Sequence, residues 1–501
     1  MGSNTLSPQE RRSSFATVLV AEAVERAGFY GVDAILLLFM VQQLGITDLR
    51  ADLMVGAFAA MTYATPLLGG WIGDCLYGPR WTAVFGTLLL GAGYALLACT
   101  TLTSRSFFEP ALALVATGNG LFKPNAAQLV RRLYEKYPLK RDSAFTLYYM
   151  AANVGSALSM FLIPWVRNTF DPLLAFSLCV AGPACALFIL LTQTGTLRDL
   201  GILTRHSVSP KRAAAFGAGS VILCILSVTF VLYSASFARL AVFSCLTVVC
   251  ILWTTLYRRA TPSERLNLVT LGIMLIQSIG FYCFYQQMQT SLTLFALTNV
   301  DGTFRILGHR IVTFSAAQFQ ALDPLFIILL SSPMARIYNV LSRRNRDVSL
   351  PTKFAIGFGF VVVAFFIWWG GTHLAAGNLT SAWFMAGGYL ALAMAEVLIG
   401  GLGLAVVAKY APASLNGIMV GAYYLTVGAG MYLGSEIASK ASSIAMSQAV
   451  QSQHYENLFG ILCLCALALA LFTLFLAQQL NRMEKRISGK NVSNTEILSI
   501  R

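Results

Sequence analysis

The dominant pattern along the chain is a series of apolar stretches, each about as long as a helix that crosses a bilayer. A membrane-spanning helix needs roughly 20 apolar residues, and such stretches recur along the 501 residues with short polar breaks between them. They predict fourteen transmembrane helices, at 15–43, 52–76, 80–100, 107–134, 142–168, 172–192, 214–233, 238–258, 266–297, 315–342, 353–374, 381–409, 414–440 and 456–480.

The polar content of these stretches divides them into three groups. The first six and the last six carry polar residues within the membrane, whereas the pair at 214–258 is almost purely apolar between basic flanks. Helices without buried polar groups are expected to face lipid, and two sets of six predict two bundles with a site between them. The predicted division is a tail (1–14), a six-helix bundle (15–192), a linker with two additional helices (193–265), a second six-helix bundle (266–480) and a second tail (481–501).

Composition supports an all-α integral membrane protein. Hydrophobic residues make up 57% of the chain and charged residues 11%, against about 25% charged residues in a soluble domain. The net charge of +14 does not indicate nucleic acid, because the basic residues lie in alternate loops and in both tails. By the positive-inside rule, this distribution places both termini in the cytoplasm: Arg11, Arg12, Arg131, Arg132, Lys136, Lys140, Arg141, Arg198, Arg205, Lys211, Arg212, Arg258, Arg259, Arg343, Arg344, Arg346, Arg482, Lys485 and Arg486.

Nothing in the sequence indicates an enzyme, a metal site or an organic cofactor. The four histidines lie mostly in predicted loops, and the ten cysteines lie mostly inside apolar stretches without a C-x-x-C pair. Neither a catalytic nucleophile nor a metal-ligand spacing is present. We therefore expect a carrier, not a catalyst.

The break between the second and third stretches carries a recognisable motif. Gly70-x-x-x-Asp74-x-x-x-Gly78-x-Arg80 resembles the cytoplasmic signature of the major facilitator superfamily. Small residues let helices approach closely, and Asp74 and Arg80 can form a pair that breaks and remakes as two bundles rock. We assign both to gating; the alternative is a tight turn with a surface ion pair of little energetic value.

One face of the first predicted helix carries charges in an otherwise apolar span. Because a charge at the bilayer centre costs at least about 2.5–3.5 kcal/mol, this face must meet partners or a watery cavity. A static ion-pair cluster is the alternative to a functional cavity. At 100° per residue, an arc of about 140° holds Glu22, Glu25, Arg26, Phe29, Tyr30 and Asp33.

This face and several later segments resemble the proton-dependent oligopeptide transporter family of the major facilitator superfamily, bacterial type. Glu22-x-x-Glu25-Arg26-x-x-Phe29-Tyr30-Gly31 is similar to the family's helix 1 signature, with Ala27 and Phe29 as departures. Further similar segments are Gly118-x-Gly120-x-x-Lys123-Pro124-Asn125 on helix 4, Tyr148 to Gly155 on helix 5, Tyr285 to Leu292 on helix 7, Gln318 to Pro324 on helix 8 and Ala395 to Gly400 on helix 10. The resemblance implies a proton-coupled symporter that imports di- and tripeptides by alternating access, with the proton as coupling ion and no other cofactor.

The resemblance also implies which residues bind the substrate. Arg26 and Lys123 suit the peptide carboxylate, and Glu396, on the opposite bundle, suits its ammonium. Asp74, Arg80, Lys123 and Glu396 are expected to gate, with Lys123 and Glu396 pairing when the cytoplasmic side closes. Hydrogen bonds to the peptide backbone and a side-chain pocket are expected from Tyr30, Tyr63, Asn153, Tyr282, Gln286, Asp323 and Tyr423.

Proton coupling requires carboxylates whose environment changes during transport. Glu22 and Glu25, beside Arg26 and Lys123, fit this role, because losing a cationic partner in a dry site favours protonation. Asp33, Gln286 and Asp323 depart from the family's usual arginine, glutamate and asparagine, so the usual Arg–Glu link between helices 1 and 7 is absent. Our hypothesis is that Asp33 or Asp323 titrates in place of the missing glutamate, or that the cavity prefers cationic peptides.

Two other functions fit parts of the same pattern. A related carrier of nitrate or an amino-acid conjugate needs the same fold without an ammonium clamp, and a non-transporting peptide sensor would bind without flux. Glu396 opposite Arg26 and Lys123 favours a zwitterion. We expect the protein to be a monomer in the bacterial inner membrane. Its expected partners are small peptides and lipid, not nucleic acid. The sequence does not predict the peptide preference, the proton stoichiometry or the resting conformation.

Overall fold

The protein is a bundle of long helices in the computed structural model, which describes residues 7–102, 105–192, 197, 210–344, 348–412, 416–440 and 448–499. Parts of the predicted tails and of the predicted linker, including residues 1–6, 198–209 and 500–501, lie outside the described residues. The first set of helices comprises α1 (Pro8–Gln42), α2 (Asp48–Ile72) with the π-turn Gly73–Tyr77, α3 (Pro79–Thr100), the 3₁₀ turn Arg105–Phe107, α4 (Phe108–Leu133), α5 (Pro138–Thr169) and α6 (Pro172–Thr192).

The remaining helices form a pair and a second set. The pair is α8 (Pro210–Tyr233) and α9 (Ala235–Arg259). The second set comprises α10 (Pro262–Tyr285), the 3₁₀ turn Gln286–Met288, α11 (Ser291–Asn299), the 3₁₀ turn Ala316–Ala321, α12 (Leu322–Arg343), α13 (Leu350–Ala375), α14 (Ala382–Leu398), the 3₁₀ turn Gly400–Leu402, α15 (Gly403–Tyr410), α16 (Asn416–Ser439) and α17 (Gln448–Ser499).

The fourteen predicted stretches all coincide with helical segments, so the predicted all-α architecture is confirmed. Two of them are interrupted by 3₁₀ turns: 266–297 at Gln286–Met288, and 381–409 at Gly400–Leu402. The second interruption lies where glycines remove the side chains that would stiffen the helix. By contrast, α4 continues through Pro124 without a break.

Hydropathy and length alone identify eleven of these helical segments as able to cross a membrane. The segments that do not meet this criterion are α1, α4 and α16. Both α1 and α4 carry buried charged or amide side chains within the span, such as Glu25 and Asn119. The helices with the weakest apolar signal are therefore among those that bring polar groups into the interior.

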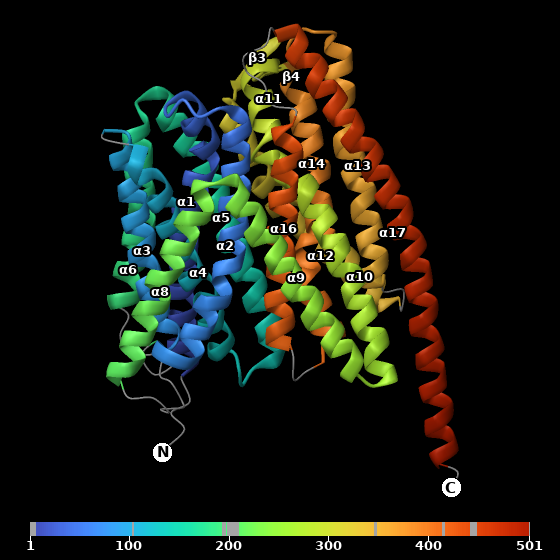
Figure 1. The fold of residues 1–501 in the computed structure, drawn as a ribbon. Helices are drawn as coiled ribbons and strands as arrows, with labels where there is room; N and C mark the ends of the chain where they lie inside the picture. Colours follow the sequence, from blue (N-terminus) through green and yellow to red (C-terminus); the bar gives the residue numbers. More distant parts are fainter. Residues whose placement is uncertain are drawn as a thin grey trace.

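The two sets of helices form two bundles that stand side by side (Figure 1). Helices α1–α6 make one bundle and α10–α17 the other, and α2 of the first packs along α16 of the second. The beginning of α1 and the end of α17 lie at the same end of the molecule (Figure 1). A chain that enters and leaves on one side has an even number of crossings, as predicted.

The apolar pair α8 and α9 lies against the outside of the bundles. Thr117 of α4 contacts Cys224 of α8 at 3.7 Å, and Arg239 of α9 forms an ion pair with Glu436 of α16 at 2.8 Å. Large apolar side chains on both helices are exposed, including Leu226 and Leu240. This exposure agrees with the prediction that the pair faces lipid.

Short strands, which the sequence analysis did not predict, lie at the end of the molecule away from the termini. Strand β1 (Val300–Asp301) pairs in parallel with β4 (Thr380–Ser381). Strands β2 (Thr303–Ile306) and β3 (His309–Thr313) form an antiparallel hairpin with a bulge. The hairpin turns at Leu307 and Gly308, both of which have positive φ.

Helices α3 and α4 touch through their backbones at Gly86, which leads to a stability prediction. A Cβ on Gly86 would lie 2.6 Å from the Phe122 nitrogen and 2.8 Å from the Gly118 oxygen, whereas a Cβ on Gly359 of α13 would meet nothing within 4 Å. Overpacking costs about 1–3 kcal/mol. We expect Gly86→Ala to lower the melting temperature in detergent by several degrees and Gly359→Ala to leave it unchanged or raise it. Equal melting temperatures for the two variants would contradict the packing described.

Candidate functional site

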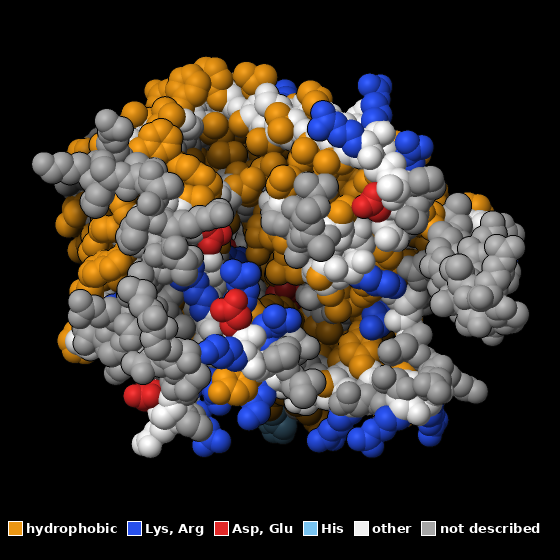
Figure 2. Space-filling model, turned by 90° about the horizontal axis from the view of Figure 1, so that it is seen from below, with side chains coloured by type: hydrophobic (Ala, Val, Ile, Leu, Met, Phe, Trp, Pro, Cys, Tyr) orange, Lys and Arg blue, Asp and Glu red, His pale blue; other side chains and the backbone are white. Residues whose placement is uncertain are grey.

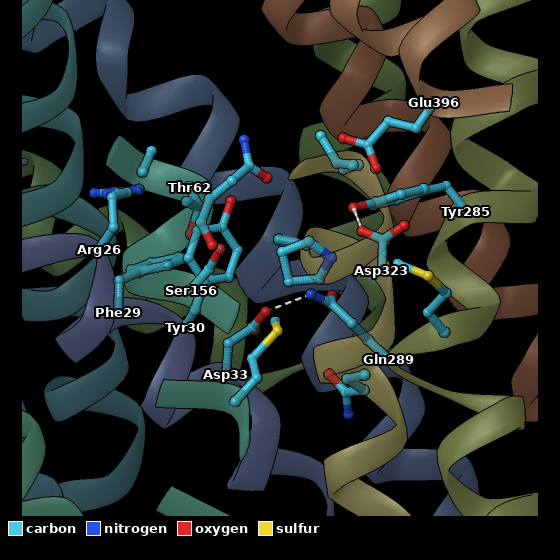
Figure 3. A pocket seen from close by; sticks show the side chains of 18 of the residues that line it. Arg26, Phe29, Tyr30, Asp33, Thr62, Ser156, Tyr285, Gln289, Asp323 and Glu396 are labelled. Carbon is cyan, nitrogen blue, oxygen red and sulfur yellow. Dashed lines mark hydrogen bonds between the residues drawn. The ribbon is translucent and has the colours of Figure 1, made fainter. Parts of the chain in front are cut away.

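A cavity of about 190 Å³ lies between the two bundles and is lined by both. Its wall combines charged, aromatic and small polar side chains, and Figure 3 shows them facing one another from the two sides. The lining comes from α1, α2, α4 and α5 on one side, and from α10, the two following 3₁₀ turns, α12, α14 and α16 on the other: Glu22, Arg26, Phe29, Tyr30, Asp33, Phe58, Ala59, Thr62, Tyr63, Lys123, Tyr148, Tyr149, Ala152, Asn153, Ser156, Met160, Tyr285, Met288, Gln289, Gln320, Asp323, Pro324, Ile327, Glu396 and Met431.

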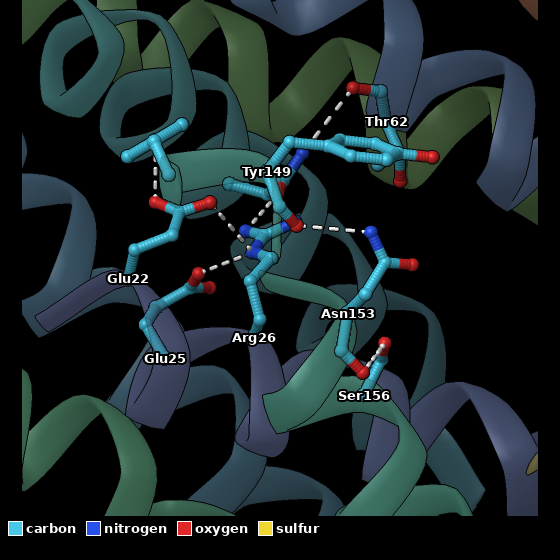
Figure 4. Close-up of polar contacts among 9 residues, drawn as sticks. Glu22, Glu25, Arg26, Thr62, Tyr149, Asn153 and Ser156 are labelled. Atoms are coloured by element: carbon cyan, nitrogen blue, oxygen red, sulfur yellow. Dashed lines mark hydrogen bonds and ion pairs between the residues drawn. The ribbon is translucent and has the colours of Figure 1, made fainter. Parts of the chain in front are cut away.

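The charges predicted on one face of the first helix do meet (Figure 4). Arg26 Nε lies 2.6 Å from Glu25 Oε2 and 3.8 Å from Glu22 Oε1, and Arg26 Nη2 donates a hydrogen bond of 2.6 Å to Asn119 Oδ1 of α4. Glu22 also accepts a hydrogen bond of 2.5 Å from the Tyr148 hydroxyl of α5. Glu22 and Arg26 reach the cavity, whereas Glu25 is fully buried behind Arg26.

Lys123 supplies a second cation on the same wall. Its Nζ lies 5.2 Å from the centre of the Tyr63 ring, a cation–π contact. Within the part of the chain that the structure describes, no hydrogen bond or ion pair holds this ammonium, although the side chain is half-buried. Glu22 and Glu25 interact with it only electrostatically, so its N–H donors stay available to an anion that enters the cavity.

Two carboxylates face these cations from the other bundle (Figure 3). Asp323 of α12 accepts a hydrogen bond of 3.1 Å from the Tyr285 hydroxyl of α10. Glu396 of α14 lies close enough for the two carboxyl groups to interact, and both are near Tyr285. Both cations of the cavity wall, Arg26 and Lys123, thus lie on the first bundle together with the acids Glu22 and Asp33, whereas the charged wall residues of the second bundle, Asp323 and Glu396, are both acids.

The predicted absence of an Arg–Glu link between helices 1 and 7 is accompanied by a different contact. Gln289, in the turn after α10, donates a hydrogen bond to the Asp33 carboxylate of α1. Figure 3 shows the two side chains meeting across the cavity. Asp33 is 8% exposed, so this amide supplies one of the few hydrogen bonds available to a buried acid.

Three of the predicted substrate-binding residues are not in the cavity wall. Tyr285, Met288 and Gln289 line it at the i, i+3 and i+4 spacing of one helical face, which turns Gln286 into the bundle interior, where it is fully buried. The other two residues outside the wall are Tyr282 and Tyr423. Their hydroxyl groups lie 3.3 Å apart, and the Tyr423 hydroxyl donates a hydrogen bond of 3.4 Å to the Gly400 oxygen. These contacts stabilise the 3₁₀ turn that follows α14.

The structure adds lining residues that the sequence analysis did not name as site residues. They lie one helical turn from a predicted residue or beside it in the same motif, so the 3.6-residue period of each helix was the signal that could have found them. The polar additions are Thr62, Tyr148, Tyr149, Ser156, Tyr285, Gln289 and Gln320.

The predicted gating pair is engaged by other partners in this conformation. The Asp74 carboxylate accepts a hydrogen bond from the Gln128 side chain, and Arg80 donates a hydrogen bond of 3.0 Å to the Leu190 oxygen. Both residues lie at the end of the first bundle where the termini are. A gating role for them stays a prediction.

In addition to the packing of α2 along α16, the bundles contact each other on the side of the cavity away from the termini. Gln318 donates to the Phe161 oxygen at 3.1 Å, and the rings of Phe161 and Phe314 are 5.4 Å apart. On the opposite side, Figure 2 shows a face that is hollowed near its centre, with Lys and Arg side chains spread around the hollow. The conformation is therefore closed at one end of the cavity and open toward the termini.

The hydrogen bond between Tyr148 and Glu22 gives a prediction about the site. Because the hydroxyl donates to a buried carboxylate, its removal costs about 1.5–3 kcal/mol. We expect Tyr148→Phe to reduce transport at least about tenfold and to lower the melting temperature by a few degrees. Tyr94→Phe is the matched control, since the buried Tyr94 hydroxyl has no hydrogen-bond partner in the described part of the chain. Equal transport by the two variants would show that the Glu22 contact is dispensable.

Comparisons with known proteins agree with this architecture. A model of the POT family matches residues 80–458. The dipeptide and tripeptide permease B of Salmonella typhimurium (strain LT2) is 33% identical over 490 residues, covering 96% of this chain and 98% of the relative. The permease B of Edwardsiella piscicida is 33% identical over 477 residues, covering 94% and 95%.

Solved structures give the same result. A bacterial homologue of the human drug peptide transporters PepT1 and PepT2 superposes with a TM-score of 0.83 at 36% identity, covering 94% of this chain and 99% of the other. Tetrameric PepTSo2 gives the same TM-score, identity and coverage. The likeness therefore spans both bundles and the additional pair of helices.

Proposed function

The chain belongs to the POT family, and from this membership and the charges of the cavity we propose that it imports di- and tripeptides together with protons. The observation that carries the proposal is the separation of charge across the cavity. Lys123 offers an unpaired ammonium on one bundle, and Asp323 and Glu396 offer carboxylates on the other. A short peptide in its zwitterionic form has the complementary charges at its two ends.

The bound peptide would lie across the bundle interface. Lys123 and the outer face of Arg26 would hold its carboxylate, and Glu396 would hold its ammonium. Tyr30, Tyr63 and Asn153 line the space between these ends and can form hydrogen bonds with the peptide backbone, which every peptide sequence shares. Apolar wall residues such as Phe29 and Met160 leave room for side chains of different kinds.

Proton coupling would arise from competition for Arg26. The guanidinium lies between Glu22, Glu25 and Asn119. A peptide carboxylate that draws Arg26 toward the cavity would leave a buried glutamate without its cation, and a carboxylate in a dry site then favours its protonated form. Peptide and proton would therefore bind together.

Alternating access would use the two bundles, 15–192 and 266–480, as rocking units, with 193–265 as the linker. Lys123 and Glu396 would pair when the cavity closes toward the termini, and Asp74 and Arg80 would exchange partners at the same end. We place both termini in the cytoplasm and the protein in the bacterial inner membrane, because the basic loop residues surround the face with the termini. We take the single chain as the transporting unit, since one chain encloses the whole cavity.

The experiment that tests this function is uptake of labelled Ala-Ala into proteoliposomes, with unlabelled competitors. Dipeptides and tripeptides should inhibit uptake, whereas single amino acids, nitrate and tetrapeptides should not. Inhibition by nitrate or by an amino-acid conjugate alone would assign the cavity to another solute. Saturable binding of Ala-Ala without any uptake would assign the protein to peptide sensing.

A further inference from the structure

The charges of the cavity exceed what a simple zwitterionic peptide can balance. On the first bundle, Arg26 is held by Glu22 and Glu25, and Asp33 accepts a hydrogen bond from Gln289. The ammonium of Lys123 also interacts electrostatically with Glu22 and Glu25, so the two cations and the two glutamates of this cluster balance. Two carboxylates, those of Asp323 and Glu396, face it.

Asp323 is a buried acid with unused hydrogen-bonding capacity. It is 4% exposed and lines the cavity, and its Oδ1 has no hydrogen-bond partner among the described residues; the same holds for Glu396 Oε2. Tyr285 satisfies only Oδ2 of Asp323, at 3.1 Å. The two carboxyl groups also lie within hydrogen-bonding reach of each other, so they share a proton unless a cationic ligand takes its place.

The groups that surround this pair of acids are tyrosines. Tyr285 of α10, Tyr30 of α1, Tyr149 of α5 and Tyr389 of α14 are close enough to interact electrostatically with one or both carboxylates. No Lys, Arg or His in the described chain forms an ion pair with either acid. Two neighbouring carboxylates in a low-dielectric site repel each other unless a cation or a proton lies between them.

We propose that Asp323 and Glu396 together bind two positive charges of one substrate, so that the transporter prefers peptides with lysine or arginine at the first position. This inference rests on the proposed function, in which Glu396 holds the peptide ammonium. Because Asp323 lies beside Glu396, the second cation must lie near the first. A basic side chain on the first residue meets this condition, since it starts from the carbon that bears the ammonium.

The test compares uptake of Lys-Ala, Ala-Ala and Asp-Ala in proteoliposomes that contain the wild-type chain, Asp323→Asn or Asp33→Asn. Wild type should take up Lys-Ala with a KM at least about tenfold lower than its KM for Ala-Ala, which is the effect expected for one charge-assisted contact. It should take up Asp-Ala least well of the three peptides. In Asp323→Asn the KM for Lys-Ala should rise much more than the KM for Ala-Ala, so that most of the advantage of Lys-Ala is lost. Asp33→Asn is the matched control, because it removes a buried cavity acid that already has an amide partner, and it should keep the preference.

Two results would overturn the inference. One is wild-type uptake of Ala-Ala and Lys-Ala with equal KM. The other is an Asp323→Asn variant that keeps the full preference; if that variant also shifts the pH dependence of Ala-Ala uptake, the acid binds a proton in place of a side chain. Failure of the proposed function is distinguishable, because wild type would then take up none of the three peptides.

Discussion

Replacing Lys123 by glutamine is expected to lower transport of Ala-Ala by about 100-fold. Truncating one partner of a buried charge pair costs about 2–5 kcal/mol, and Lys123 is the ammonium that no other described residue pairs with. The loss should depend on the peptide carboxylate. The amide of Ala-Ala lacks that carboxylate. It should inhibit Ala-Ala uptake only weakly in wild type, and it should inhibit uptake by the variant to the same extent.

The matched control for this prediction is Lys353→Gln. Lys353 of α13 also lies over an aromatic ring, at 4.2 Å from the centre of Tyr338, but it is not in the cavity wall. Removal of its ammonium should leave uptake near the wild-type level. If both variants transport Ala-Ala equally well, Lys123 does not bind the peptide carboxylate.

The second large effect is expected from Glu25→Gln, which should abolish uphill accumulation of peptide. Glu25 is fully buried and its Oε2 lies 2.6 Å from Arg26 Nε. Glutamine keeps the shape of the side chain but cannot exchange a proton. The variant should therefore still exchange internal for external peptide, while a proton gradient no longer drives net uptake.

Glu22→Gln should behave in the same way, because Glu22 lies 3.8 Å from the same guanidinium. The control is Glu436→Gln, which removes an acid that forms an ion pair with Arg239 at 2.8 Å outside the cavity. This control should accumulate peptide like wild type. Undiminished accumulation by both Glu22→Gln and Glu25→Gln would remove these two residues from the coupling step.

The fold was largely predictable because bilayer thickness sets the length of each apolar stretch. Eleven of the fourteen helical segments meet this constraint by length and hydropathy alone, and among the three that do not, α1 and α4 carry buried charged or amide side chains. The outward placement of the two apolar helices α8 and α9 follows from their lack of polar groups. The strands at 300–313 and 380–381 were not predicted. They are short segments between helices, and their pairing depends on how the second bundle brings distant loops together.

The site was predictable where a charge lies in an apolar span. Glu22, Arg26, Lys123, Asp323 and Glu396 all line the cavity, as expected from the high cost of a buried charge without a partner. Neutral polar residues carry no such constraint. Gln286 and Gln289 look alike in the sequence, and only the orientation of the helical face decides that Gln289 reaches the cavity and Gln286 does not.

Pairings across the interface were also beyond sequence reasoning. The contact between Asp33 and Gln289 joins residues 256 positions apart in the chain, and no local pattern specifies it. The partners of Asp74 and Arg80, which are Gln128 and the Leu190 oxygen within the first bundle, were not predicted either. These are the contacts expected to change when the cavity opens to the other side.

The most direct test of the account is uptake of labelled Ala-Ala into proteoliposomes that hold a pH-sensitive dye, with and without an inward proton gradient and an inside-negative potential. We predict accumulation above the external concentration only when the gradient or the potential is present, acidification of the lumen in step with uptake, and loss of both with a protonophore. Uptake that merely equilibrates under every condition, without acidification, would contradict proton-coupled import.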